Sequence, residues 1–459
     1  MKRLLRLTAN QHETLRRHLF PGDGKEAVAL ARCGRRSGES EHVLMAHEVF
    51  LVPHSDCRVR EPDCVYWPPA VGHELYDRAA AKSMGILKIH SHPAGFDRFS
   101  HLDDQSDKEL FQSLHSWTDD GLPHASAVML PDGKMFGRFV GPSGEFHLID
   151  RISVIGDHIR LFDREQNRAI DDAQLRTAQA FGDQTTLLLK RLRVAVVGCS
   201  GTGSWVIEQL VRLGVGQLVI VDPDVVERKN LNRIVNSNLS QAERKASKVA
   251  ALAAALRAHG TGTEITPLEG LLFDEGIAKA VAGCDVVFGC MDKFEGRDRL
   301  NRLAVFYLLA YIDLGVRLDA DGKGGIDNVC GAVHYLLPDG SSLLSRGCYS
   351  SETLRVEALL RTDPAQYKAE LDEGYIKGAK VDSPAVISVN GFCASMAVNE
   401  LLARLHPYRE NRLEDERFHS FDLRNCDWTQ REEGAACKLL AKKAGRGDMT
   451  PFLDCITDV

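Results

Sequence analysis

The clearest pattern of apolar and polar positions lies between Val194 and Arg233. An apolar run, Val194 to Val197, predicts a buried parallel strand, and a turn reading GCSGTG follows it. Next come an amphipathic helix and a second apolar run, Leu218 to Val221, which ends at Asp222. Strand, glycine turn, helix, strand and acid form the layout of a nucleotide-binding βαβ unit, in which glycines and helix N–H groups face a phosphate.

The alternation of strands and helices continues beyond this unit, through 243–258, 285–290 and 297–316. It predicts a Rossmann-like α/β domain with a mostly parallel sheet covered on both faces. The pattern before residue 148 mixes strand-like runs with helices and predicts a separate α+β domain. We therefore expect an α+β domain over 1–148, a helical linker over 149–185 and the α/β domain over 186–459.

Composition excludes several classes of protein. The net charge of -7 favours neither nucleic acid nor an anionic membrane as a partner. No apolar run is long enough to span a bilayer, so we expect no membrane association. The 12 cysteines are scattered singly, without a Cys-x-x-Cys pair. In a chain of 459 residues this favours reduced thiols and a cytoplasmic location.

Charged residues downstream of the glycine turn suit the activation of a carboxylate by ATP. Attack on the α-phosphorus requires positive groups near the phosphates and a carboxylate that holds Mg²⁺. Arg233, Lys248, Asp292 and the amides of residues 198–203 supply these parts, and Asp222 would bond the ribose. A dehydrogenase, the other reading of a glycine-rich turn, needs neither the basic pair nor the metal carboxylate.

A second constellation lies in the first domain, where His90-x-His92-Pro93 is followed by Ser100 and Asp103. Two histidines one residue apart on an extended segment can both reach one ion, and an aspartate at the start of the next helix can complete three ligands. That set leaves a fourth position for water, as in a catalytic zinc site. Ser100 could stabilise a developing oxyanion, and a general base is still required.

The second domain resembles the ThiF/MoeB/E1 superfamily over about residues 176–405, in the motifs VVGxxGxGS, NLNR and the later Asp292-Lys293. The resemblance implies adenylation of the C-terminal glycine of a ubiquitin-like protein or sulfur carrier. Asn230 and Arg233 would then contact phosphates, and Lys248, preferred to Lys245, would neutralise them. The remaining nucleotide and magnesium positions implied are Gly198, Gly201, Gly203, Asp222, Asp224 and Asp292.

Three further features of this superfamily concern particular residues of the chain. Ser342 and Ser345 stand where many prokaryotic members have a zinc-binding Cys-x-x-Cys. The transfer cysteine of the family has no match in residues 374–384, and Cys348 is the nearest loop thiol that could accept the acyl group. Its flanking arginine would favour the thiolate, whereas an ordinary loop cysteine is the alternative. Arg176 resembles the arginine that members lend across a dimer, which implies a homodimer.

The first domain resembles the JAMM (JAB/MPN+) metalloproteases over roughly 20–145, in the pattern His-x-His-Pro-x6-Ser-x2-Asp. These enzymes cut peptide or isopeptide bonds after the terminal glycine of ubiquitin-like proteins. The resemblance implies zinc on His90, His92 and Asp103, with Glu26 as the general base and Glu48 as the alternative.

Together the two resemblances imply a bifunctional enzyme of a bacterial ubiquitin-like modification pathway. One half would adenylate the modifier with ATP and Mg²⁺, and the other would cut after its terminal glycine with Zn²⁺, in precursor processing or deconjugation. An E2-like protein would be a further partner, and antiphage defence a plausible context. Sulfur-carrier activation for cofactor or cysteine biosynthesis is one alternative. A non-catalytic scaffold that binds a ubiquitin-like protein is another.

Overall fold

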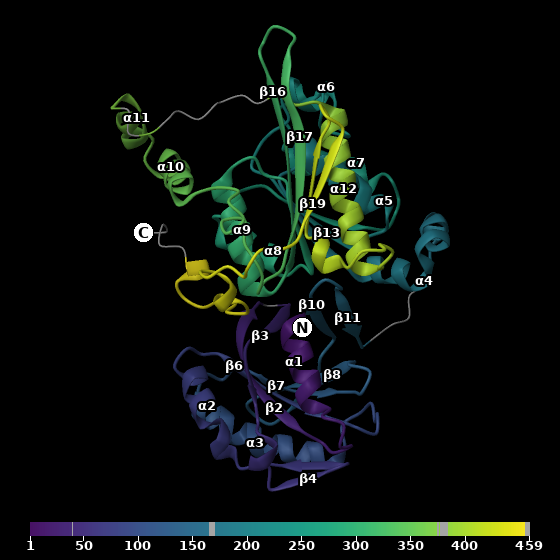
Figure 1. The fold of residues 1–459 in the computed structure, drawn as a ribbon, viewed down its shortest axis with the longest axis vertical. Coiled ribbons are helices and arrows are strands. Elements are labelled where there is room, and N and C mark those ends of the chain that lie inside the picture. The colour runs from purple at the N-terminus through teal and green to yellow at the C-terminus, as the bar shows by residue number, and fades with distance from the viewer. Residues whose placement is uncertain (39, 165–169, 374–375, 377–383, 455–459) are drawn as a thin grey trace. The chain divides into compact units, whose positions relative to one another are not determined.

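The chain forms two compact units, each built around its own sheet (Figure 1). The computed structural model describes residues 1–38, 40–164, 170–373, 376 and 384–454. The first unit holds the described residues up to 164, with 305–308 and the segment from Lys442 onward. The second unit holds the described residues up to Ala304 and then Leu309 to Ala441.

The first unit contains a nine-stranded sheet in the order β11-β10-β1-β3-β2-β6-β7-β8-β9. Its strands are β1 (Lys2–Thr8), β2 (Val28–Ser37), β3 (Glu41–Leu51), β6 (Gly85–Ser91), β7 (His124–Met129), β8 (Met135–Val140), β9 (Phe146–Leu148), β10 (Arg151–Ile155) and β11 (Arg160–Asp163). The other elements are the hairpin β4 (Val59–Glu61) and β5 (Cys64–Tyr66), and the helices α1 (Ala9–Leu19), α2 (His73–Ala80) and α3 (His101–Thr118).

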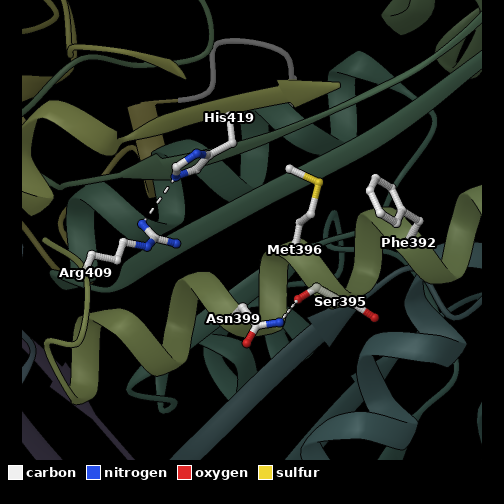
Figure 2. A pocket seen from close by; sticks show the side chains of 6 residues that line it. All are labelled: Phe392, Ser395, Met396, Asn399, Arg409 and His419. Atoms are coloured by element: carbon white, nitrogen blue, oxygen red, sulfur yellow. Dashed lines mark hydrogen bonds between the residues drawn. The ribbon is translucent and has the colours of Figure 1, made fainter. Parts of the chain in front are cut away.

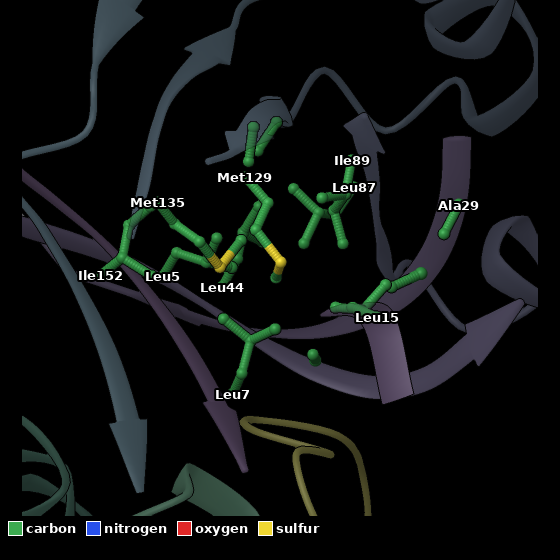
Figure 3. Close-up of a cluster of buried hydrophobic side chains, with 14 of the residues drawn as sticks. Leu5, Leu7, Leu15, Ala29, Leu44, Leu87, Ile89, Met129, Met135 and Ile152 are labelled. Carbon is green, nitrogen blue, oxygen red and sulfur yellow. The ribbon is translucent and has the colours of Figure 1, made fainter. Parts of the chain in front are cut away.

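Strand β6 is buried on both faces, and this places polar side chains inside the unit. Leu87 and Ile89 point into a cluster that includes Leu5, Leu15 and Met129 (Figure 3). Side chains alternate between the faces of a strand, so Lys88 and His90 lie on the opposite face. That face belongs to the second cluster, which joins Ile86 of β6 to Phe111 and Leu114 of α3.

Helix α3 begins at a capping box made by its own site residues. The Ser100 hydroxyl accepts a hydrogen bond from the Asp103 amide, and the Asp103 carboxylate accepts one from the Ser100 amide. The buried positions of α3 are Asp103, Asp107, Leu110, Phe111 and Leu114, a spacing typical of one helix face. Two acids therefore share the buried face with the apolar residues.

The second unit contains an eight-stranded sheet in the order β14-β13-β12-β15-β16-β17-β18-β19. Its strands are β12 (Arg193–Val197), β13 (Gln217–Val221), β14 (Glu264–Leu268), β15 (Val286–Gly289), β16 (Ala310–Ala320), β17 (Ile326–Leu336), β18 (Phe418–Asp422) and β19 (Asp427–Arg431). In that order, neighbouring strands from β14 through β13, β12 and β15 to β16 pair in parallel. The pairs β16–β17, β17–β18 and β18–β19 are antiparallel. This is the Rossmann-like α/β architecture with an antiparallel extension.

The helices of the second unit are α4 (Leu175–Arg191), α5 (Gly201–Arg212), α6 (Leu239–Glu243), α7 (Lys248–Arg257), α8 (Glu275–Ala282), α9 (Phe294–Tyr307), α10 (Ser351–Thr362), α11 (Pro364–Asp372) and α12 (Ile387–Leu405). Strand order reverses between β12 and β15, and ligands of open α/β sheets bind at the carboxyl ends of the strands beside such a point. Among the described helices, none has the length and apolar character that crossing a bilayer requires.

Two secondary-structure predictions were wrong. Residues 149–185 were expected to form a helical linker, but 151–155 and 160–163 are the strands β10 and β11. The alternation of buried Ile152 and Val154 with more polar neighbours is strand-like, and β10 pairs in parallel with β1. The helix expected over 243–258 begins only at Lys248, as α7, because α6 ends at Glu243 and Lys245 adopts a φ of 51° between the two.

Near its C-terminus the chain returns to the first unit. The described residues from Lys442 to Asp454 belong to that unit, although they follow the second unit in sequence. Backbone hydrogen bonds join Gly34 N to Gly445 O at 3.0 Å and Asp448 N to Arg35 O at 2.8 Å. This segment therefore pairs with the end of β2, beyond the residues of β2 that pair with β6.

Candidate functional site

The first unit brings together the two histidines of the sequence motif. His90 lies near the end of β6 and His92 just after it, and their Nε2 atoms are 3.1 Å apart. The His92 Nδ1 atom lies 2.6 Å from the Phe96 carbonyl oxygen, so it carries the proton and leaves Nε2 as a free ligand atom. Both side chains are buried.

Asp103 closes this cluster from the start of α3. Its Oδ1 atom is 2.8 Å from His90 Nε2, and its Oδ2 atom is 3.5 Å from His92 Nε2. Burial raises the pKa of Asp103, but the hydrogen bonds with the two histidines outweigh it and hold that pKa far below its usual range. One carboxylate and two imidazole nitrogens therefore meet at one point.

The donor set fits a zinc ion. Ring nitrogens on a tetrahedral zinc, with bonds of about 2.0–2.1 Å, lie roughly 3.3 Å apart, which is close to the separation of the His90 and His92 Nε2 atoms. Nitrogen and carboxylate oxygen are also the ligands of three-ligand catalytic zinc sites. The fit rests on this convergence of Nε2 and Oδ atoms.

Glu26, rather than Glu48, belongs to the cluster. The ligand atoms of Glu26, His90 and His92 all lie within 4.8 Å of one another. Burial raises the pKa of Glu26 to about 7, against a smaller opposing effect of His92. Glu48 on β3 instead pairs with Arg32 at 3.0 Å and with Arg78 at 2.9 Å.

Ser100 is tied to Asp103 in this structure. Its hydroxyl donates to Asp103 Oδ2 at 2.8 Å and accepts from the Asp103 amide at 3.1 Å. These bonds place the hydroxyl beside the two-histidine cluster. Its contribution to an oxyanion site stays a prediction.

The glycine turn of the second unit connects β12 to α5 at the carboxyl end of the parallel strands. Gly198 has a φ of 93°, and a Cβ there would lie 2.5 Å from the Cys290 carbonyl oxygen. A Cβ on Gly203 would overlap the Gly198 carbonyl oxygen. Both positions therefore require glycine, because the turn crosses close to β15 and then folds onto itself.

Asp222, just after β13, holds this turn by hydrogen bonds. Its Oδ2 atom accepts a hydrogen bond from the Cys199 amide at 2.7 Å, and its Oδ1 atom accepts one from the Asp224 amide at 2.9 Å. The side chain is buried. A ribose, as the sequence predicted, would have to share oxygens that already hold the turn, and this role stays a prediction.

Lys248 is the first residue of α7 and joins the two acids. Its Nζ atom lies 2.8 Å from Asp224 Oδ2 and 3.4 Å from Asp222 Oδ1. Burial lowers the pKa of Lys248, but the two carboxylates outweigh it and raise that pKa, so the ammonium stays charged. Lys245, the alternative, is exposed and lies outside the helices.

Arg233 lies against the glycine turn, together with a residue that the sequence did not single out. A methyl group on Gly201 would lie 3.3 Å from Arg233 Cδ and would overlap the Asn390 amide. Asn390 is buried in the first turn of α12, far along the chain from the turn. Its only sequence signal was a polar position within an apolar helix.

Asn230 and Asp292 occupy different environments. Asn230 is buried, and its Oδ1 atom accepts from the Glu227 amide at 3.0 Å. Asp292 is exposed just beyond β15, two residues after the Cys290 that contacts Gly198. Asp292 is thus placed at the carboxyl edge of the sheet, and the ligand roles of both residues stay predictions.

The comparison with protein families decides what kind of unit this is. The profile of the ThiF family matches residues 172–439, which is more than half of the chain. The chain belongs to the ThiF family. The matched residues include the glycine turn, Asp222, Asp224 and Lys248, and they do not include the histidine cluster of the first unit.

Curated relatives of this ThiF-family chain include activating enzymes. The SAMP-activating enzyme E1 of Haloferax volcanii is 34% identical over 149 residues, 32% of this chain and 50% of that protein. Ubiquitin-like modifier-activating enzyme 5 of Culex quinquefasciatus is 25% identical over 226 residues, 47% of this chain and 51% of that protein. The chain spans about half the length of these relatives.

Another relative is the molybdopterin-synthase adenylyltransferase of Salmonella typhimurium, 34% identical over 114 residues, 25% of this chain and 45% of that protein. Among solved structures, Escherichia coli MccB with ATP aligns with a TM-score of 0.44 and 17% identity. That alignment covers 61% of this chain and 76% of MccB.

Cys348, the predicted acyl acceptor of the ThiF unit, lies beside a histidine. Its Sγ atom is 3.8 Å from Nε2 of His334 on β17. Burial raises the pKa of the Cys348 thiol, and the nearby Arg297 and Arg346 offset only part of that rise. These surroundings therefore do not support the expected preference for the thiolate, since burial outweighs the flanking arginines. The loop at 374–384 lies largely outside the described residues.

The serine pair at the family's zinc-knuckle positions forms a hydrogen-bonded cluster. The Ser342 amide donates to Ser345 Oγ at 2.9 Å, and the Ser345 amide donates to Ser342 Oγ at 3.1 Å. Cys437 lies beside them. Burial raises the pKa of Cys437, but hydrogen bonds from Ser342, Ser345 and backbone amides outweigh it and lower that pKa. Hydroxyl contacts thus occupy the place of thiolate ligands.

The ThiF unit also contains Arg176, Cys393 and a surface hollow. Arg176 is exposed on α4 and donates to Gln179 at 3.1 Å. Cys393 is buried in α12. A hollow of about 280 Å³ is lined by Phe392, Ser395, Met396, Asn399, Arg409 and His419 (Figure 2). It contains none of the predicted site residues.

Proposed function

We propose that the ThiF unit adenylates the C-terminal glycine of a ubiquitin-like or sulfur-carrier protein. The observation that carries the proposal is the contact of Lys248 with Asp222 and Asp224 beside the glycine turn. In the reaction a carboxylate oxygen of the glycine forms a bond to the α-phosphorus of ATP. The bond from that phosphorus to the β-phosphate bridge breaks, and pyrophosphate leaves with both electrons of that bond.

Each residue has a defined part in this reaction. The amides of the glycine turn and the N-terminus of α5 would bind phosphate oxygens. Lys248 and Arg233 would offset the charge that develops on the leaving pyrophosphate. Asp292, with Asp224, would hold Mg²⁺, because carboxylates are its preferred protein ligands. Asp222 would keep the turn in place and contact the ribose.

ATP–pyrophosphate exchange with a candidate carrier tests this proposal. Lys248→Ala and Asp292→Ala are expected to lose exchange by about 100-fold or more, as removal of charge stabilisation does. Lys245→Ala is the matched control, since Lys245 is exposed, and it should keep wild-type exchange. Undiminished exchange in Lys248→Ala and Asp292→Ala would contradict the assignment.

We infer that the first unit is a JAMM-type zinc peptidase that cuts after the same glycine. The observation that carries this proposal is the convergence of Glu26, His90, His92 and Asp103. The two histidines and Asp103 would hold zinc, which when bound would lower the pKa of a water to about 7 and polarise a carbonyl. Glu26, buried and with its pKa near neutrality, would take the proton of that water and pass it to the leaving amine.

Cleavage of a carrier extended beyond its glycine tests the peptidase. Glu26→Gln and His92→Ala are expected to abolish cleavage, whereas Glu48→Gln should retain it because Glu48 pairs with Arg32 and Arg78. Chelation should stop cleavage, and zinc should restore it. Cleavage that survives both His92→Ala and chelation would defeat the assignment.

The fate of the adenylate separates two versions of the function. In a modification pathway of a bacterial cytoplasm, such as an antiphage system, the acyl group would pass to Cys348 or directly to an E2-like protein. In the sulfur-carrier version the product is a thiocarboxylate. Intact-mass analysis of the carrier distinguishes them. A scaffold without catalysis would bind a carrier and give neither product. We also propose a homodimer in which Arg176 reaches the partner's nucleotide.

A further inference from the structure

Beneath the histidine cluster lies a second set of buried charges that the peptidase chemistry does not use. Lys88 on β6 lies 2.7 Å, Nζ to Oδ1, from Asp107 on α3. Arg138 on β8 reaches the same carboxylate, with Nε at 3.0 Å and NH2 at 2.7 Å from Oδ2. The Lys88, Asp107 and Arg138 side chains are 4% exposed or less.

The spacing links this network to the cluster. Lys88 is two residues before His90, so both lie on one face of β6. Asp107 is four residues after Asp103, so both lie on one face of α3. Strand and helix are thus joined twice in the same way, by His90 with Asp103 and by Lys88 with Asp107.

Arg138 extends the contact to the segment that precedes α3. Its guanidinium is 3.8 Å from the centre of the Phe99 ring and 3.7 Å from that of Phe146. It also pairs with Asp104 in the first turn of α3. Phe99 immediately precedes Ser100, so Arg138 holds both sides of the capping box.

Lys88 and Arg138 are paired with Asp104 and Asp107, so the network carries no net charge of its own. A buried ion pair is also a poor source of stability, because desolvation offsets the attraction. The consequence of the network is geometric, because it fixes the position of α3 along β6.

We propose that Lys88, Asp107 and Arg138 are positioning residues for the metal site, because they set where Asp103 and Ser100 lie against His90 and His92. The inference rests on the proposed zinc site. In metal proteins, residues that contact the metal ligands orient those ligands, and the network would do the same here. Loss of such residues typically weakens metal binding or activity by about 10–100-fold.

Metal binding by the full chain tests the network without reference to cleavage. The variants are Lys88→Met and Asp107→Asn, with Lys108→Met as a matched control on the exposed face of α3. Zinc affinity is measured by competition with a chromophoric chelator. The visible absorption of the Co²⁺ form reports ligand geometry.

Lys88→Met and Asp107→Asn are expected to bind zinc about 10–100-fold more weakly and to change the Co²⁺ spectrum, while Lys108→Met matches wild type. The triple variant Lys88→Met/Asp107→Leu/Arg138→Met replaces the network by apolar side chains, a change that proteins tolerate. It should fold even where Asp107→Asn does not, and it should show the same weakened binding.

Two results would overturn the proposal in distinguishable ways. Wild-type zinc affinity and an unchanged Co²⁺ spectrum in folded Lys88→Met and in the triple variant would show that the network does not position the site. If His92→Ala also bound zinc like wild type, the proposed metal site itself would fall, and the network's role with it.

Discussion

At the scale of single residues, two glycines determine whether the phosphate turn can form. Gly198 requires a positive φ and lies against Cys290, and Gly203 touches the Gly198 carbonyl. Glycine is a steric requirement at both positions, because the turn after β12 passes close to Cys290 and then folds onto itself.

We predict that Gly203→Ala destabilises the ThiF unit by at least about 1–3 kcal/mol and removes ATP–pyrophosphate exchange. The added methyl group would displace the turn that Asp222 holds. Gly315→Ala is the control, because a Cβ there meets nothing within 4 Å. Thermal unfolding and exchange are measured on both, and equal behaviour of the two variants would contradict the geometry.

A second residue-scale prediction concerns Glu400, which is buried in α12. Burial raises the pKa of Glu400, but the hydrogen bond from His419 and the charges of Arg404 and Arg409 outweigh it and lower that pKa to about 2. Because the pKa in the folded state is depressed, the carboxylate stabilises the fold above its unfolded value of 4.5. That contribution is lost as the pH falls from about 4.5 towards 2.

Glu400→Gln should therefore lower the free energy of unfolding at pH 7 by about 3–5 kcal/mol, the usual effect of breaking a buried pair. The deficit should shrink at pH 3. Denaturant titrations of wild type and variant at the two pH values measure it. A deficit that stays constant between pH 7 and pH 3 would disprove the linkage.

At the scale of elements, α12 brings a distant part of the chain to the nucleotide turn. The Asn390 amide nitrogen lies where a methyl group on Gly201 would be, so this helix borders the turn. The helix spans Ile387–Leu405. Its contact with Gly201 depends on packing between elements that are far apart in sequence, which no local pattern reveals.

We predict that Asn390→Ala raises the KM for ATP about 10-fold, the effect of one lost hydrogen bond to a charged group, with little change in the unfolding midpoint. Asn399→Ala is the matched control on the same helix, where the amide donates to Ser395 at 2.8 Å. Exchange kinetics at varied ATP concentration give the comparison. An unchanged KM for Asn390→Ala would remove this residue from the site.

The sequence indicated some residues of the candidate sites and missed others. The approach of His90, His92 and Asp103 to one another could be predicted, because short-range spacing places them at the end of one strand and the start of the next helix. Glu26 was indicated only by the family resemblance. Lys88 and Asp107 were missed, since a lysine in an apolar strand and an acid within a helix have no local signature of pairing. Strand β10 was misassigned because its partner, β1, lies at the other end of the unit's sequence.

At the scale of the whole molecule, the first unit is completed by the C-terminus. The segment from Lys442 onward contributes the Ala444 carbonyl, which lies 2.7 Å from His47 Nδ1, and the Gly445 carbonyl, which bonds to Gly34. Two units that alternate along the chain in this way cannot be separated by one cut between them.

We predict that a chain ending at Ala441 loses stability in the first unit and therefore loses carrier cleavage, while ATP–pyrophosphate exchange is retained. The removed segment bonds to Gly34 and Arg35 at the end of β2, the strand that begins two residues after Glu26. Cleavage and exchange are assayed on the same preparation. Full cleavage by the truncated chain would contradict this role of the C-terminal segment.

The central claim is that one chain carries two active sites for one glycine terminus. The most direct measurement is the intact mass of a carrier precursor, extended beyond its glycine, after incubation with the zinc-loaded chain and ATP. Wild type should trim the precursor and then activate it, Asp292→Ala should only trim it, and His92→Ala should leave it unchanged. Activation of the untrimmed precursor, or trimming by His92→Ala, would contradict the account.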